Sequence, residues 1–136
     1  MKYWLLKTEP SVYSFDDLLK DKKTVWDGVA NNAALICIRN ARKGDLAIIY
    51  HTGDERQMIG IGEIISEPYP DPKEDNPKLV VFDIKPLKRL KTPVTLSQIK
   101  ADKKYKDFAL VKEARKSVLE VPEEYWNEFM KLSGTV

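Results

Sequence analysis

Three aromatic side chains fall where predicted strands or turns end, a placement that can build a pocket for a flat ring. Trp26 precedes Asp27 and Gly28, a pair favoured in tight turns. Tyr50 ends an apolar run, and Tyr69 lies in a proline-rich segment. Stacking a nucleobase on an aromatic side chain contributes roughly 1–3 kcal/mol. The three aromatics therefore predict a pocket that clamps a planar ring.

Polar side chains near these aromatics could read the edge of such a ring. The candidates are Thr8, Glu9, Asn31 and His51. Alternatively, each aromatic packs over the core and leaves only its polar tip in water. This alternative can explain each aromatic side chain on its own, so only the occurrence of all three at such positions favours a pocket.

Catalytic chemistry finds less support in the sequence. His51 is the only histidine, and a general base needs a nucleophile or an orienting carboxylate within hydrogen-bond reach. No serine elbow, Cys-His signature or phosphate-binding glycine loop accompanies it. One histidine and one cysteine, Cys37, do not make a zinc site, so we expect no metal and no cofactor. A small nucleotide-processing hydrolase that uses His51, with Glu9 or Asp27, remains the enzymatic alternative.

The charge balance restricts how the chain could bind nucleic acid. Its 23 basic and 21 acidic residues leave a net charge of only +2, so binding must depend on local patches. Two basic runs, "KPLKRLK" and "VKEARKS", provide such patches, although either could be an ordinary solvated face. The candidate contacts to a nucleic-acid backbone are Lys88, Arg89, Lys112, Arg115 and Lys116.

The elements that would position these residues follow from periodicity and capping. Ser14, Thr95 and one of Asn31 or Asn32 are predicted helix caps. Gly60 and Gly62 predict a strand that another backbone or a ligand approaches closely. We predict an α+β fold, a mixed sheet of five or six strands curled toward a barrel with helices at its openings. The predicted strands cover 2–8, 24–26, 45–52, 57–69, 79–90 and 116–121, and the main helices 15–21, 33–41, 96–102 and 122–132.

Length and composition set the expected organisation and location. A chain of 136 residues predicts a single domain, residues 1–136. No apolar run approaches the roughly 20 residues that span a bilayer, and the first residues do not resemble a signal peptide. We therefore expect a monomer in the cytoplasm, or in the nucleus of a eukaryotic cell, with no membrane contact.

Five motifs in order, "KYWLLKTEP", "VWDGV", "KGDLAIIYHT", "GIGEIISEPYPDP" and "ARKSVLEV", make the chain resemble the EVE domain family. That family belongs to the PUA-like superfamily and is related to the YTH readers of methylated adenine. The resemblance implies a PUA-like β-barrel that binds a modified base without acting on it. The implied partner is DNA with a modified cytosine, or RNA. The alternative is a PUA-like RNA-binding module without preference for a modification.

The resemblance also implies roles for individual residues. Lys7, Thr8 and Glu9 would form the pocket rim, with Trp26 as the stacking wall; further contacts would come from Tyr50, His51, Arg115 and Ser117. Arg115 is the implied contact to a phosphate or sugar. The chain departs from the family where Ala30 replaces the usual arginine after "WDGV", while Asn31 keeps the family's asparagine. One expected cation is therefore missing near the pocket.

Overall fold

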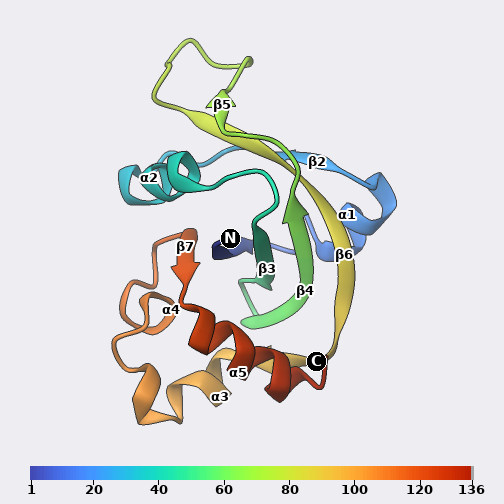
Figure 1. Cartoon of the computed structure of the whole chain (residues 1–136), viewed down its shortest axis with the longest axis vertical. Helices are drawn as coiled ribbons and strands as arrows, with labels where there is room; N and C mark the ends of the chain where they lie inside the picture. Colours follow the sequence, from blue (N-terminus) through green and yellow to red (C-terminus); the bar gives the residue numbers. More distant parts are fainter. Residues whose placement is uncertain (136) are drawn as a thin grey trace.

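The structure, a computed structural model, describes residues 1–135 and has a curled mixed sheet at its centre (Figure 1). Neighbouring strands follow the order β2-β6-β4-β3-β1-β7. The β1–β3 pair is parallel, and the other neighbours in this order are antiparallel. The prediction of a curled mixed sheet is therefore confirmed. The strands are β1 (Tyr3–Thr8), β2 (Thr24–Trp26), β3 (Leu46–His51), β4 (Gln57–Ile64), β5 (Tyr69–Pro70), β6 (Val80–Thr95) and β7 (Val118–Val121).

Strand β6 is longer than predicted and carries much of the curl. It pairs with β2, β4 and the short β5, and it continues past the predicted end at residue 90 because β4 needs a partner along its whole length. Both β4 glycines are needed for close packing. A Cβ at Gly60 would lie 2.4 Å from the Phe15 ring, and one at Gly62 would lie 2.9 Å from the Lys85 carbonyl oxygen.

The helices begin where the capping residues predict. The Ser14 hydroxyl and the Asp17 carboxylate form a capping box at α1, and the Asn31 side chain accepts a hydrogen bond from the Ala34 N–H at α2. Thr95 caps α3 in the same way as Ser14 caps α1. The helices are α1 (Phe15–Asp21), α2 (Asn32–Asn40), α3 (Leu96–Lys100), η1 (Lys103–Tyr105), α4 (Ala109–Lys112) and α5 (Glu123–Ser133). Within residues 1–135, no helix is long and apolar enough to cross a bilayer.

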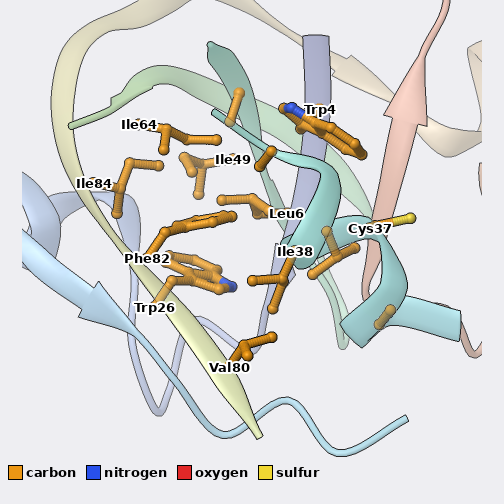
Figure 2. Packing of buried hydrophobic residues seen from close by; sticks show 14 of the residues in the cluster. Trp4, Leu6, Trp26, Cys37, Ile38, Ile49, Ile64, Val80, Phe82 and Ile84 are labelled. Carbon is orange, nitrogen blue, oxygen red and sulfur yellow. The ribbon is translucent and has the colours of Figure 1, made fainter. Parts of the chain in front are cut away.

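The sheet separates two hydrophobic clusters, because successive side chains of a strand point to opposite faces. Trp4 and Leu6 of β1 pack with α1 and α2 in the first cluster, part of which is shown in Figure 2. Leu5 lies in the second cluster, together with side chains from α3, α4 and α5. Trp26 belongs to the first cluster and Tyr50 to the second. These two aromatics therefore lie on opposite faces of the sheet.

The sheet curls without closing. Among residues 1–135, β2 pairs only with β6 and β7 pairs only with β1, so these two strands are the free edges. Helix α2 packs against both β6 and β7 and covers part of the opening between the edges. The candidate site lies at the part of this opening that α2 does not cover.

Candidate functional site

A cleft of about 430 Å³ opens at the gap between β2 on one side and β1 and β7 on the other. Four stretches of chain and one further residue contribute to it: the end of β1, the segment before α1, strand β2, the turn after β2, and the residue preceding β7. We call this hollow the edge cleft. It is lined by Lys7, Thr8, Val12, Tyr13, Thr24, Val25, Trp26, Asp27, Gly28, Val29 and Ser117.

Two aromatic rings form one corner of the edge cleft. Trp26 ends β2 opposite Phe82 of β6, and its ring faces inward (Figure 2). Only 8% of this residue is exposed, and it packs in the first cluster. The Tyr13 ring meets it edge-on, with 6.5 Å between centroids and 83° between planes. Trp26 is thus both a core residue and part of the cleft wall.

Tyr13 is held by hydrogen bonds at its hydroxyl group and at its backbone carbonyl oxygen. Its hydroxyl donates to Asp21 Oδ2 at 2.9 Å, and its carbonyl oxygen accepts from the Thr8 hydroxyl at 2.6 Å. Burial raises the pKa of the Tyr13 phenol, so the ring stays neutral at physiological pH. The edge cleft therefore presents an uncharged, positioned aromatic side chain beside Trp26.

Charged groups lie at different places on the cleft wall. Lys7 Nζ donates to the Ala114 carbonyl oxygen at 2.9 Å, and burial lowers the pKa of this half-buried ammonium. Across the opening, Asp27 Oδ2 lies 3.5 Å from Lys73 Nζ. The cleft thus offers a cation, a carboxylate and hydroxyl groups around two rings. A cavity of this size and lining suits a planar heterocycle whose edge carries donors and acceptors.

The structure brings four of the ten predicted pocket residues to the edge cleft: Lys7, Thr8, Trp26 and Ser117. Tyr50 does not join them, because the alternation of β3 turns its ring into the second cluster. His51 is also elsewhere. It is 6% exposed, its Nε2 accepts a hydrogen bond from the Phe15 N–H at 3.0 Å, and its Nδ1 lies 2.9 Å from Glu55 Oε1. Its ring therefore links β3 to the start of α1.

Three other predicted pocket residues hold local structure outside the edge cleft. The Glu9 carboxylate accepts hydrogen bonds from the Ser11 N–H and hydroxyl, and the Asn31 side chain caps α2. The Tyr69 hydroxyl donates to Asp83 Oδ1 at 2.5 Å, which raises the pKa of Tyr69 to about 12. None of these three side chains is part of the lining of the edge cleft.

The predicted basic residues separate into two groups. Arg115 and Lys116 directly precede Ser117 in the sequence, and Ser117 lines the edge cleft. Arg89 pairs with Asp16 and Lys112 lies 3.9 Å from Asp107, while Lys88 Nζ donates to the Thr135 carbonyl oxygen. The charges of the β6 run are thus directed to neighbouring elements of the fold.

Sequence reasoning missed the second ring of the cleft, Tyr13, and the polar side chain of Thr24. It considered Asp27 only as a partner of His51. Tyr13 precedes the α1 cap by one residue, a position at which an aromatic has no distinctive pattern. The signal that could have found it is topological: the segment after β1 and the turn after β2 reach the same opening of the sheet.

Comparison with known proteins identifies the relatives of this chain. The family model of the EVE domain matches residues 2–132. Thymocyte nuclear protein 1 of Rattus norvegicus is 31% identical over 124 residues, which is 72% of this chain and 55% of the rat protein. The human protein of that name is 30% identical, over 73% of this chain and 56% of its own length. This chain therefore spans about half the length of these relatives.

Solved structures agree closely with the fold. Rpa0253 from Rhodopseudomonas palustris superposes with a TM-score of 0.94 at 42% identity, covering 100% of this chain and 95% of that one. Human THYN1 in complex with DNA containing 5-methylcytosine superposes with a TM-score of 0.87 at 27% identity, covering 98% of each chain. The barrel-like fold implied by the sequence resemblance is therefore confirmed.

Proposed function

The chain belongs to the EVE domain family, and from that premise we propose that it binds a modified base of DNA in the edge cleft, without catalysing a reaction. The base we favour is a modified cytosine. Under this proposal Trp26 and Tyr13 contact the ring of the base, while Lys7, Thr24, Asp27 and Ser117 contact its edge and the adjoining backbone.

The observation that carries the proposal is the combination of two rings with convergent polar groups at an unpaired sheet edge. A base that enters the cleft meets an aromatic corner on one side and the Lys7 ammonium on another. Stacking supplies roughly 1–3 kcal/mol per base, and hydrogen bonds at the base edge add selectivity. Extrusion of a base from a duplex costs a few kcal/mol, which contacts of this size can offset.

The human relative supports the choice of ligand, because it forms a complex with DNA containing 5-methylcytosine and superposes over nearly the whole chain. This chain has Ala30 where the resemblance implies an arginine. Lys73, whose Nζ lies 3.5 Å from Asp27 Oδ2, provides a cation on the same rim of the cleft. We propose that Lys73 takes over part of the missing arginine's attraction for a phosphate.

The non-catalytic part of the proposal rests on His51. Both of its ring nitrogens face partners within the fold, and it lies outside the cleft lining. A hydrolytic mechanism would need this histidine beside the bound base, with Nε2 free to accept a proton from water. We infer that His51 stabilises the β3–α1 contact.

The test is a binding titration at fixed salt, with matched single-stranded and duplex DNA and RNA that carry cytosine, 5-methylcytosine, 5-hydroxymethylcytosine or N6-methyladenine. The wild type is expected to prefer one modified cytosine in DNA. The variant Tyr13→Ala should lose about tenfold in affinity for that ligand, because it removes one stacking surface.

The matched control is Tyr69→Ala, which removes a tyrosine outside the cleft and should leave this affinity unchanged. Equal affinity for modified and unmodified oligonucleotides would contradict the proposal. A steep salt dependence without base preference would instead indicate a phosphate-binding module, and preference for the RNA series would replace DNA as the partner.

A further inference from the structure

An exposed apolar side chain lies at the mouth of the edge cleft. Val12 lines the cleft and is 80% exposed, the highest fraction among the large hydrophobic side chains of residues 2–135. Single exposed apolar residues are common on protein surfaces. What distinguishes Val12 is its place at the tip of a short, fixed segment, residues 9–13, which we call the tip segment.

Hydrogen bonds hold the tip segment in one shape. The N–H groups of Val12 and Tyr13 both donate to the Glu9 carbonyl oxygen at 2.9 Å. The Glu9 carboxylate accepts from the Ser11 N–H and hydroxyl, at 3.1 and 3.0 Å. Thr8 fastens the other end through its bond to the Tyr13 carbonyl oxygen. A flexible loop could fold an apolar side chain against the protein, whereas this segment presents Val12 outward.

The contacts behind the tip segment are equally close. A Cβ at Gly53 would lie 2.5 Å from Glu9 Oε2, so the turn after β3 packs directly against the Glu9 side chain. The turn after β3 therefore supports the tip segment at Glu9. A side chain pressed against a partner at this point would not be displaced easily.

We propose that the tip segment is a wedge, in which Val12 enters a DNA duplex at the position that the extruded base has left. The inference rests on the proposed function, and it adds that the natural ligand is a duplex. An extruded base leaves a gap in the stack, and apolar side chains at the binding surface can fill such gaps. Val12 adjoins the cleft that receives the base, so a single approach of the protein fills both places.

The charges around the edge cleft fit a duplex that crosses it. Lys22 and Lys23 precede Thr24 on the β2 side, and Arg115 and Lys116 precede Ser117 on the β7 side. Within the described part of the chain, none of these four side chains takes part in an ion pair. Cations on both sides of an apolar tip suit the backbones that flank an opened base pair.

The experiment compares Val12→Ser with Val12→Leu, because the first removes the apolar surface and the second keeps it. The ligands are one sequence with a single 5-methylcytosine, in duplex and single-stranded form, and the same pair with cytosine. Val12→Ser should weaken binding to the methylated duplex roughly tenfold and binding to the methylated single strand much less, whereas Val12→Leu should keep both affinities. Leu87→Ser, at an exposed position on β6 outside the cleft, is the control expected to change neither.

A second readout follows the base stack directly. A 2-aminopurine placed beside the methylated cytosine should brighten when the wild type binds, and less when Val12→Ser is saturated with the same duplex. Equal losses by Val12→Ser on duplex and single strand, or no loss on either, would overturn the wedge while the base-binding proposal stands. If the wild type does not distinguish methylated from unmethylated DNA in either form, the base-binding proposal fails and the wedge fails with it.

Discussion

The edge cleft and a second hollow beside α5 have similar size and each has a tryptophan in its wall, but their other lining residues differ. The α5 groove has a volume of about 540 Å³ and is lined by Leu46, Ile61, Leu87, Lys88, Trp126, Asn127, Met130, Lys131 and Thr135. Each hollow contains one tryptophan that is almost buried, with 8% of Trp26 and 6% of Trp126 exposed. Size and an aromatic residue alone therefore do not separate the two.

The difference lies in the partners of the two tryptophans. Trp126 stacks on Tyr3, with 4.5 Å between ring centroids and 25° between planes, so a neighbour already covers one of its faces. Tyr13 meets Trp26 edge-on. Both lysines donate to a backbone carbonyl oxygen, Lys88 to that of Thr135 and Lys7 to that of Ala114. The edge cleft also contains the carboxylate of Asp27, which has no counterpart in the lining of the α5 groove. The edge cleft therefore combines two aromatic rings with a cation, a carboxylate and hydroxyl groups, whereas the α5 groove offers one ring and no carboxylate.

The largest expected effect is on stability, and it should be similar for the tryptophans of the two hollows. Trp26→Ala and Trp126→Ala each remove a large side chain from a core cluster, so each should lower the free energy of unfolding by about 3–5 kcal/mol. Chemical denaturation measures this loss. A Trp26→Ala variant as stable as the wild type would show that Trp26 is less integrated in the core than its burial indicates.

Conservative variants of the two tryptophans should then show which hollow binds DNA. Trp26→Phe keeps an apolar ring, so it should fold while losing several-fold in affinity for methylated DNA, since a smaller ring stacks less well. Trp126→Phe should fold and bind as the wild type does. Titration of both variants with one methylated duplex, after matched circular dichroism spectra, provides the comparison. Loss of binding in Trp126→Phe alone would move the site to the α5 groove.

The two lysines test the electrostatic side of the comparison. Lys7→Met should weaken binding about tenfold or more, because a hydrogen bond from a charged donor contributes roughly 1.5–3 kcal/mol. Lys88→Met should have little effect, since Lys88 lies in the other hollow. Binding at several salt concentrations separates a lost phosphate contact, which flattens the salt dependence, from a lost contact to the base edge, which does not.

The pH dependence of binding should also reveal the contribution of Lys7, with a smaller effect than the substitution. Burial lowers the pKa of Lys7, so its ammonium loses its proton at a lower pH than an ordinary lysine does. Affinity should therefore fall as the pH rises through that lowered pKa, and Lys7→Met should abolish this part of the pH profile. The folded protein binds this proton less tightly than the unfolded chain, so the contribution of Lys7 to stability rises over the same range. Unfolding through Lys7 therefore cannot explain the lost binding, and a profile identical in wild type and Lys7→Met would contradict this assignment.

The smallest effect is expected at the rim. Lys73 and Asp27 form an exposed ion pair, with 75% and 42% of the two side chains accessible, so Lys73→Gln should change the free energy of unfolding by only a few tenths of a kcal/mol. Affinity for DNA should decline about twofold if Lys73 attracts a phosphate. An increase in affinity would indicate that Lys73 competes with the ligand for Asp27.

Much of the fold follows from local patterns in the sequence, whereas the site depends on topology. The caps at Ser14, Asn31 and Thr95 are set by residues a few positions apart. Ser14 and Thr95 were predicted correctly, and Asn31 is one of the two residues predicted for α2. Tyr50 lies in the second cluster because β3 alternates regularly, with Ile48 and Tyr50 on one face and Ala47 and Ile49 on the other. Which of these faces borders the opening of the sheet depends on the strand order, and no local pattern reports that order.

The cleft itself illustrates the same limit. Lys7, Trp26 and Ser117 come from strands or strand ends that are far apart in the chain, and they meet because β2 and β7 are the two free edges. Trp26 was predicted from its position beside a turn, whereas Lys7 and Ser117 were supplied by the resemblance to the family. Tyr13 needed the structure, because its contact with Trp26 crosses the gap between the segment before α1 and the end of β2.

The central claim, that a modified base enters the edge cleft, can be tested most directly with the indole N–H resonances of the three tryptophans. Trp4 donates its indole N–H to Asp45 within the core, Trp126 lies in the α5 groove, and Trp26 lines the edge cleft. During titration of labelled protein with a duplex containing one 5-methylcytosine, the Trp26 signal should shift strongly and the other two should stay in place. The unmethylated duplex should shift it much less. Movement of the Trp126 signal with Trp26 unchanged would contradict the account.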